Sequence, residues 1–410
     1  MKKSHVMFAL ALAVGLWALL PGPARAQSIK DPAEYNAYVG ALNQQDPQAR
    51  ISSLEGFLIQ YPNTVAKEDA LLGLLGAYFQ TQNQAKAMET ANRIVQVNPN
   101  NLRALVVLVS TKRAAAQANQ NPQQNLTEAR QFAERGLQAI QTAKPREGEP
   151  PEEFEKLRTQ AGIIFHGAIG LSAMQNKEYD LAQKHLRAAV EANPNDVNDV
   201  YALATAYLSS TPPDDVNGLW FIARAANLVA GSPAEKQISD FGRKRYRHYH
   251  GSEEGWPELL AQSKSMALPP TGFAIKPAPT PAEMAQEMVE SKSVREMNFA
   301  EFEFILGVGG APAEKVWTEI QGKPLRFQGK VIGASRTMLR LAATQDAIDE
   351  NRADVELTMA AAVPIRLVPK AGADIAVEGE PNAYDAKPFV MKMQNGALLQ
   401  TSGGTKPRAR

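Results

Sequence analysis

The stretch from Ile163 to Pro194, IIFHGAIGLSAMQNKEYDLAQKHLRAAVEANP, decides the fold class of the chain. Its apolar residues recur at helical spacing on both sides of the polar turn 175–177, which predicts two short antiparallel helices. The residues expected to face one another are His166, Ile169, Gly170 and Ala173 in the first helix and Ala182, Leu186, Ala189 and Val190 in the second. Small residues at Gly170 and Ala182 should let the helices approach closely. One pair leaves an apolar face uncovered, so the stretch predicts neighbouring pairs.

The order of residues in this stretch is similar to that of the tetratricopeptide repeat, a helix-turn-helix unit of about 34 residues. In the first helix the order is large, large, Gly and small, and in the second it is Ala, large, Ala and then Pro194. The same phase recurs from Leu71, Leu105 and Val200. About five helix pairs would then occupy residues 31–265, more than the roughly three that stacking requires. The resemblance implies an α-α superhelix, a solenoid with a concave inner face.

The geometry of the family, carried over position by position, implies which side chains line the inner face. They are Phe79, Gln80, Arg103, Ser110, Arg113, Asn198, Tyr201, Thr205 and Ser209. This mixture of aromatic rings, hydroxyls and two arginines suits an extended or helical peptide from a partner protein. The alternative for any one of these side chains is a solvated helix surface.

The N-terminus has the three-part layout of a secretory signal peptide. Lys2 and Lys3 precede the apolar run 6–20, and Ala24-Arg25-Ala26 forms a small-residue cleavage site. We therefore expect residues 1–26 to be a signal peptide cleaved after Ala26. An uncleaved membrane anchor is the alternative, but the run is shorter than the roughly 20 residues that a spanning helix needs. We expect a periplasmic or secreted protein with no membrane span in the mature chain.

Composition and motifs exclude several classes of function. The 410 residues carry a net charge of +1, which becomes −2 when Lys2, Lys3 and Arg25 leave with the signal peptide. A protein with this charge is not expected to coat nucleic acid. The chain has no cysteine, which excludes disulfides, a thiol nucleophile and a thiolate metal site. No nucleophile elbow, His-Glu-x-x-His or dinucleotide fingerprint is present. We therefore expect no enzyme activity, no cofactor and no metal site.

Residues 236–260, KQISDFGRKRYRHYHGSEEGWPELL, have the most unusual local composition. Basic and aromatic residues interleave there, as on a surface that binds nucleic acid or an anionic polysaccharide: Arg243, Lys244, Arg245, Tyr246, Arg247, Tyr249 and Trp256. The other interpretation is a capping helix, with Phe241, Tyr249 and Trp256 packed on the last repeat and the basic side chains solvated. We favour the cap, because a solenoid must cover its last apolar face.

The composition changes after residue 265. A proline-rich linker is expected over 266–282 and a helical connector over 283–322. From Lys323 the apolar period becomes two, and five strands over 323–401 resemble a small OB-type β-barrel. Tyr384 is the one aromatic residue of these strands that we expect to be exposed for base stacking. The tail 402–410 should be disordered.

The sequence thus predicts a multidomain α + β protein, a helical solenoid followed by a small all-β barrel. The function we expect is that of an exported, non-enzymatic scaffold or adaptor of the bacterial cell envelope, which binds a partner polypeptide on the inner face. Binding of nucleic acid or anionic polysaccharide through residues 243–256 and the barrel is the alternative function.

Overall fold

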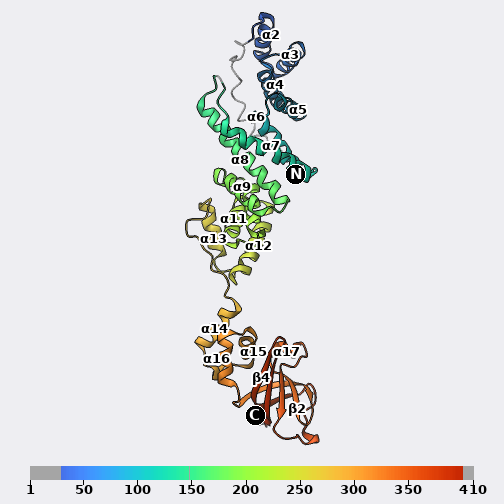
Figure 1. Ribbon diagram of the computed structural model, residues 1–410, viewed down its shortest axis with the longest axis vertical. Coiled ribbons are helices and arrows are strands. Elements are labelled where there is room, and N and C mark those ends of the chain that lie inside the picture. Colours follow the sequence, from blue (N-terminus) through green and yellow to red (C-terminus); the bar gives the residue numbers. More distant parts are fainter. Residues whose placement is uncertain (1–28, 147, 400–410) are drawn as a thin grey trace, which may run out of the picture. The chain divides into compact units, whose positions relative to one another are not determined.

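The computed structural model describes residues 29–146 and 148–399 (Figure 1). The expected signal peptide, 1–26, and the expected tail, 402–410, lie outside the described residues. The chain divides into two compact units between Pro277 and Ala278. Each unit is described by itself below.

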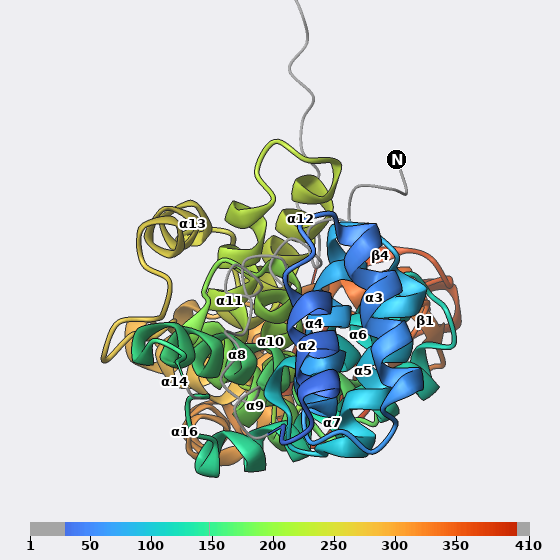
Figure 2. The same ribbon diagram turned by 90° about the horizontal axis from the view of Figure 1, so that it is seen from above.

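The first unit is a stack of helix pairs (Figures 1 and 2). Its helices are α2 (Pro32–Leu42), α3 (Pro47–Gln60), α4 (Lys67–Gln80), α5 (Gln84–Val97), α6 (Leu102–Gln117), α7 (Pro122–Thr142), α8 (Pro151–Gln175), α9 (Tyr179–Ala192), α10 (Val197–Ser209), α11 (Asp215–Leu228), α12 (Pro233–His250) and α13 (Trp256–Ser265). Helices consecutive in the chain pack together from α2 to α12, and α13 packs on α11. Most contacts are therefore between neighbours, as expected for a solenoid.

The α8–α9 pair shows how the sequence produces this packing. Ala182, Leu186 and Val190 lie on one side of α9 and are fully buried. Gly170 of α8 faces them so closely that a Cβ atom there would lie 2.5 Å from Leu186 Cγ and 3.1 Å from the Leu186 backbone nitrogen. The absence of a side chain at position 170 thus sets the distance between the two helices. The prediction that small residues allow this approach is confirmed.

The last pair is closed by aromatic side chains of α12 and α13. Trp256 and Tyr246 are buried and their rings lie 5.9 Å apart, while Tyr249 is half-buried against the same core. Phe241, by contrast, is exposed. The capping role predicted for Trp256 and Tyr249 is confirmed, and that of Phe241 is wrong, because Tyr246 takes the inward position on α12.

A buried arginine ties this cap to the repeats. The guanidinium of Arg224 on α11 donates to the carbonyl oxygens of Pro194, Ser263 and Lys264 and to Asn195 Oδ1 at 2.7 Å. These carbonyls belong to the end of α13 and to the turn after α9, where helix geometry leaves backbone acceptors unsatisfied. Arg224 therefore joins two chain segments that are distant in the sequence.

Part of the proline-rich stretch expected to be a linker, 266–282, belongs to the helical unit. Ile275 is buried in the core of α10 to α13, and the ring of Phe273 packs edge-on against Trp220 at 4.8 Å. The Lys276 carbonyl lies 2.7 Å from His250 Nδ1. The segment thus covers the end of the solenoid up to the division after Pro277.

The second unit joins short helices to a closed five-stranded barrel. Its helices are α14 (Pro281–Ser291), η3 (Val294–Glu296), α15 (Phe299–Val308) and α16 (Gly310–Ile320), and its strands are β1 (Leu325–Ala334), β2 (Met338–Ala342), β3 (Val355–Met359), β4 (Asp374–Ala386) and β5 (Phe389–Leu399), with α17 (Gln345–Asp349) after β2 and η4 (Ile365–Leu367) after β3. The strand order is β1-β2-β3-β5-β4, with β3 and β5 parallel. The predicted helical solenoid followed by a small β-barrel is confirmed.

The stretch expected to be a helical connector, 283–322, shares one core with the barrel. Phe299 of α15 packs against Phe327 and Phe389, and Trp317 of α16 packs against Tyr384 at 4.9 Å. Tyr384 is therefore half-buried under α16, and the expectation that it is exposed for base stacking is wrong.

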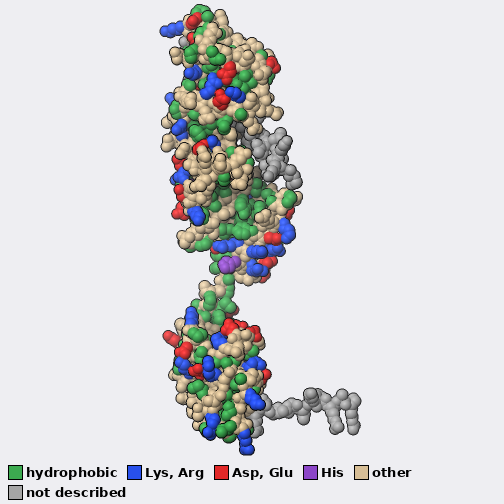
Figure 3. All heavy atoms as spheres, turned by 90° about the vertical axis from the view of Figure 1, so that its right-hand side faces the viewer, with side chains coloured by type: hydrophobic (Ala, Val, Ile, Leu, Met, Phe, Trp, Pro, Cys, Tyr) green, Lys and Arg blue, Asp and Glu red, His purple; other side chains and the backbone are tan. Residues whose placement is uncertain are grey.

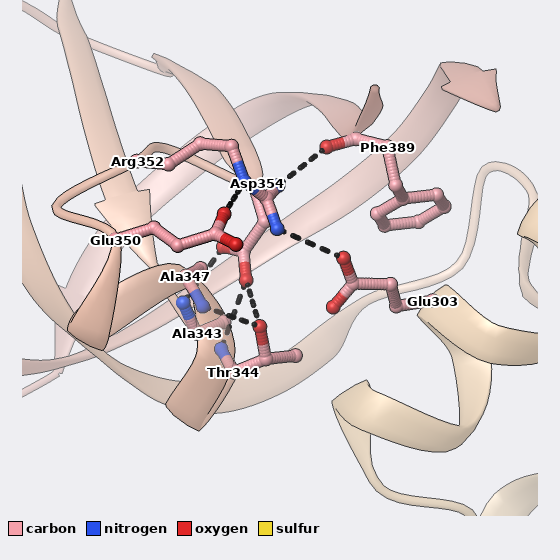
Figure 4. Close-up of polar contacts among 8 residues, drawn as sticks. All are labelled: Glu303, Ala343, Thr344, Ala347, Glu350, Arg352, Asp354 and Phe389. Atoms are coloured by element: carbon pink, nitrogen blue, oxygen red, sulfur yellow. Dashed lines mark hydrogen bonds and ion pairs between the residues drawn. The ribbon is translucent and has the colours of Figure 1, made fainter. Parts of the chain in front are cut away.

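Polar contacts at the α17 end of the barrel hold these parts together (Figure 4). Arg352 donates to the Phe389 carbonyl at 3.2 Å, pairs with Glu303 of α15 at 3.4 Å and with Glu350 at 3.0 Å. The fully buried Asp354 carboxylate accepts hydrogen bonds from the Ala343 and Thr344 backbone and from the Thr344 hydroxyl, at 2.7 to 2.9 Å. These polar groups are paired with one another or with backbone groups of the same unit, so the cluster has a structural role.

Two glycines of α8 provide a matched test of the close helix approach. Gly170→Ala places a methyl group against Leu186 and should lower the free energy of unfolding by about 1–3 kcal/mol. Gly162→Ala meets only Ile140 Cδ1 at 4.0 Å, so it should stabilise the helix by about 0.5–1 kcal/mol. Thermal unfolding followed by circular dichroism measures both. An equal effect of the two substitutions would contradict the packing described here.

Candidate functional site

The inner face predicted from the repeats is closed over its first half. Every residue of α4 from Asp69 to Tyr78 is buried, and so is every residue of α6 from Ala104 to Val109. For α6 the cause is the length of α8, which has 25 residues against 14 in α9, whereas α4 is buried in a core shared with α2, α3, α5 and α6. The first turns of α8 carry Phe154 and Leu157 into the same core as the apolar side chains of α6. A partner therefore has little access to α4 and α6.

The segment between α7 and α8 adds two ion pairs to this closure. Glu149 pairs with Arg103 at the start of α6, and Arg146 pairs with Asp69 at the start of α4. The Glu149 carboxylate also accepts a hydrogen bond from the Arg146 backbone at 3.0 Å. Arg103, which we predicted to line the groove, is thus largely covered and engaged within the chain.

Arg113 of α6 is also engaged within the chain. Its guanidinium pairs with the buried carboxylate of Asp199 on α10 at 2.7 Å, and the two side chains meet over Gly167 of α8. A Cβ atom at position 167 would lie 2.5 Å from both Arg113 Nη1 and Asp199 Oδ2. Burial raises the pKa of Asp199 to about 6, although the Arg113 charge opposes that shift. The pair joins three successive inner helices instead of offering a free cation.

The predicted site residues on α10 do reach solvent. Asn198 is exposed, the Tyr201 side chain is 39% exposed, and Thr205 is half-buried with its hydroxyl donating to the Tyr201 carbonyl at 2.9 Å. Ser209 continues the same stripe, while the opposite side of α10 is buried. We call Asn198, Tyr201, Thr205 and Ser209 the α10 stripe.

The remaining predicted groove residues lie elsewhere. Phe79 is half-buried and packs against the core of α2 to α5, whereas Gln80 is exposed at the end of α4. On α8 the half-buried Leu171 and Met174 pack at the edge of the core that contains α10. Figure 3 shows hydrophobic side chains gathered on one face of the helical unit, over the part that holds α9 to α12.

The basic segment of α12 is balanced by acidic residues. Arg243 pairs with Asp240, Arg245 pairs with Asp215 of α11 at 2.6 Å, and Arg247 pairs with Glu253 at 3.5 Å. Tyr249 is half-buried rather than displayed beside these cations. The arginines are evident in the sequence, but it could not reveal that Asp215 would lie beside Arg245.

A histidine pair that the sequence did not single out as a site lies within the central repeat. His166 Nδ1 on α8 and His185 Nδ1 on α9 are 3.0 Å apart, and both side chains are half-buried. Burial, together with His166, Lys184 and Arg130, lowers the pKa of His185 to about 4, against a small opposing effect of Glu134. Burial and Lys184 also lower the pKa of His166. The folded protein thus favours the neutral pair.

The described part of the chain contains no candidate metal site and no membrane-spanning helix. Within 29–146 and 148–399 there is no group of three or more His, Asp or Glu side chains placed to hold a metal ion. Over the same residues no helix is long and apolar enough to cross a membrane.

Comparison with known proteins bears on the repeat itself. Residues 165–196 match the family model for the tetratricopeptide repeat. The chain contains a tetratricopeptide repeat. The matched residues are the α8–α9 pair and the turn after it, and the flanking pairs repeat its arrangement.

One solved structure similar to this chain is a thermophilic TPR protein of Thermus thermophilus, at 17% sequence identity and a TM-score of 0.25. The similarity covers 52% of this chain and 98% of that one. At that TM-score it carries no inference about this protein. No curated protein matches the chain.

The ion pair between the repeats predicts unequal costs for single and double substitution. Arg113→Met leaves Asp199 buried without its partner and should lower the free energy of unfolding by about 3–5 kcal/mol. Adding Asp199→Leu should restore most of that loss, because no uncompensated charge remains. Lys156→Met, at the exposed pair with Glu153, should leave the free energy of unfolding nearly unchanged, because solvent screens an exposed ion pair. A double variant as unstable as Arg113→Met would contradict the coupling.

The histidine pair predicts a defined pH dependence. The pKa of His185 is about 4 in the folded protein, against an ordinary value of 6.5 in the unfolded chain. Protonation of His185 therefore opposes folding as the pH falls from 6.5 towards 4. His185→Gln should therefore raise the melting temperature relative to wild type by an amount that grows over that window. The corresponding gain in the free energy of unfolding should reach on the order of 1–2 kcal/mol at the low end of the window, after allowance for solvent screening of a half-buried pair. His248→Gln, at an exposed position on α12, is the control. A difference independent of pH would contradict the assignment.

Proposed function

We propose that this chain is a non-catalytic scaffold whose α10 stripe binds a segment of a partner polypeptide. The observation that supports this most directly is the contrast along the inner helices, which are covered at α4 and α6 and open at α10. The tetratricopeptide repeat is in general a scaffold unit for protein–protein interaction, which supports a binding role over a catalytic one.

The chemistry of the stripe suits a peptide. Tyrosine is enriched at binding hot spots because its ring buries a large area while its hydroxyl can form a hydrogen bond. Asn198 offers an amide that can donate to and accept from a peptide backbone, and Thr205 adds a small polar contact. Leu171 and Met174 of α8 are half-buried apolar side chains near the same core. Together they favour a partner segment with at least one apolar side chain flanked by backbone hydrogen bonds.

We further propose that the protein acts after export. The support is the sequence pattern of residues 1–26, with its basic start, apolar run and small-residue site at Ala26. In this proposal the β-barrel positions the captured partner or adds a second contact. Binding of nucleic acid or anionic polysaccharide through α12 is less well supported, because Arg243, Arg245 and Arg247 each face a carboxylate of the same chain.

Two tyrosines of nearly equal exposure give the test. Tyr201→Ala should reduce recovery of partner protein from crosslinked envelope fractions by about ten-fold or more, the loss typical of a hot-spot side chain. Tyr35→Ala on α2, where the native side chain is 37% exposed, should leave recovery unchanged. Both variants should keep the wild-type melting temperature. Equal recovery with Tyr201→Ala and wild type, or equal losses from both changes, would refute the proposed surface.

A further inference from the structure

The barrel has an ordered tip built from two segments, the turn 335–338 between β1 and β2 and the segment 360–370 after β3. The Val363 amide donates to the Arg336 carbonyl at 2.7 Å, and Arg336 Nε donates back to the Val363 carbonyl at 3.2 Å. The Met359 amide donates to the Thr337 carbonyl at 2.9 Å. These bonds join the two segments, which we call the barrel tip.

The barrel tip displays large aliphatic side chains to solvent. Ile365 is 78% exposed and Leu367 58% exposed, and Met338 in the other segment is 42% exposed. The η4 turn fixes the first two, since the Leu367 amide donates to the Pro364 carbonyl at 2.8 Å. Single exposed apolar residues are common on proteins, but a fixed group of them usually marks a contact surface.

The charges of the barrel tip all have one sign. Arg336, Arg366 and Lys370 are exposed, and neither segment contains an aspartate or glutamate. Along the strands, by contrast, basic side chains pair with acids, as in Lys330–Asp374, Arg340–Glu356 and Lys392–Asp385. The tip is therefore a local cationic surface on a unit whose other basic residues are largely balanced.

Within the second unit, the barrel tip lies at the end of the barrel opposite to α17. The β2 strand runs from the tip to α17 and β3 runs back, so the tip and α17 lie at opposite ends of the barrel. Figure 1 shows α14 to α17 around one end of the barrel and the loop after β3 at the other. The helices that cover Tyr384 and Phe389 therefore do not shield Ile365 or Leu367.

We propose that the barrel tip docks on a membrane surface that contains anionic phospholipid. Ile365 and Leu367 enter the boundary between headgroups and acyl chains, while Arg336, Arg366 and Lys370 face the lipid phosphates. Interfacial membrane binding combines apolar side chains that insert with basic side chains that face anionic headgroups, and the barrel tip has both. A protein groove is the less suitable partner, because the exposed tip offers no aromatic anchor and no charge of the opposite sign. The contact is weak and reversible, since each basic residue near the surface contributes about five-fold in affinity.

Vesicle co-sedimentation tests this proposal with the chain that begins at Gln27. The probes are vesicles of phosphatidylcholine alone and of phosphatidylcholine mixed equally with phosphatidylglycerol. Wild type should bind the anionic vesicles about ten-fold or more better than the neutral ones, and Arg366→Gln with Lys370→Gln should remove most of that preference. Ile365→Ser with Leu367→Ser should lower binding about ten-fold or more, because the inserted aliphatic area is lost.

The matched control is Ile59→Ser, at a position on α3 that is 79% exposed but far from the barrel in the sequence. It should bind vesicles as wild type does, and all variants should keep the wild-type melting temperature because the changed side chains are exposed. Absence of vesicle binding by wild type would overturn the proposal. So would undiminished binding by the Ile365 and Leu367 double variant, or an equal loss from Ile59→Ser.

Discussion

The inner side of the helical unit depends on the ion pair between Arg113 and Asp199, which meet over Gly167. Only a residue without a side chain at position 167 leaves room for both charged groups, and only Arg113 compensates the carboxylate that α10 buries. The pair holds α6 and α10 against α8. Gly170, about one helical turn further on, lets α9 approach α8 closely. The central helix α8 is thus narrow at these two glycines, where α6, α10 and α9 approach it closely.

This arrangement explains why the open surface lies at α10. The first turns of α8 cover α6 with apolar contacts, and the segment before α8 reaches α6 through the Glu149–Arg103 ion pair and α4 through the Arg146–Asp69 ion pair. No ion pair or apolar contact of this kind is found over the α10 stripe among the described residues, and Asn198 and Tyr201 stay in contact with solvent. The residues that we propose bind a partner and the residues that hold the repeats together therefore occupy similar positions on successive inner helices. Their roles differ because the chain segments adjoining each helix differ.

The sequence predicted the features that depend on local periodicity. The helix pairs, the spacing role of Gly170 and the five-stranded barrel all arise from patterns within a few residues of one another, and the structure agrees with them. The partners of Arg103 and Arg113 could not be predicted, because they lie 46 and 86 residues away in the sequence. Helical periodicity identifies the buried side of a helix but not which remaining stripe meets another segment. For the same reason Phe241 was expected to be buried when Tyr246 takes the inward position, and Tyr384 was expected to be exposed when α16 covers it.

The central claim is that the partner meets α10 and not the earlier inner helices. Site-specific photocrosslinking in cells tests it most directly, with p-benzoylphenylalanine placed at position 201 in one variant and at position 80 in another. Tyr201 and Gln80 are both exposed, and both were expected on the inner face from the repeat pattern. The account predicts a discrete crosslinked partner from position 201 and none from position 80. A partner crosslinked from position 80 and not from position 201 would contradict it.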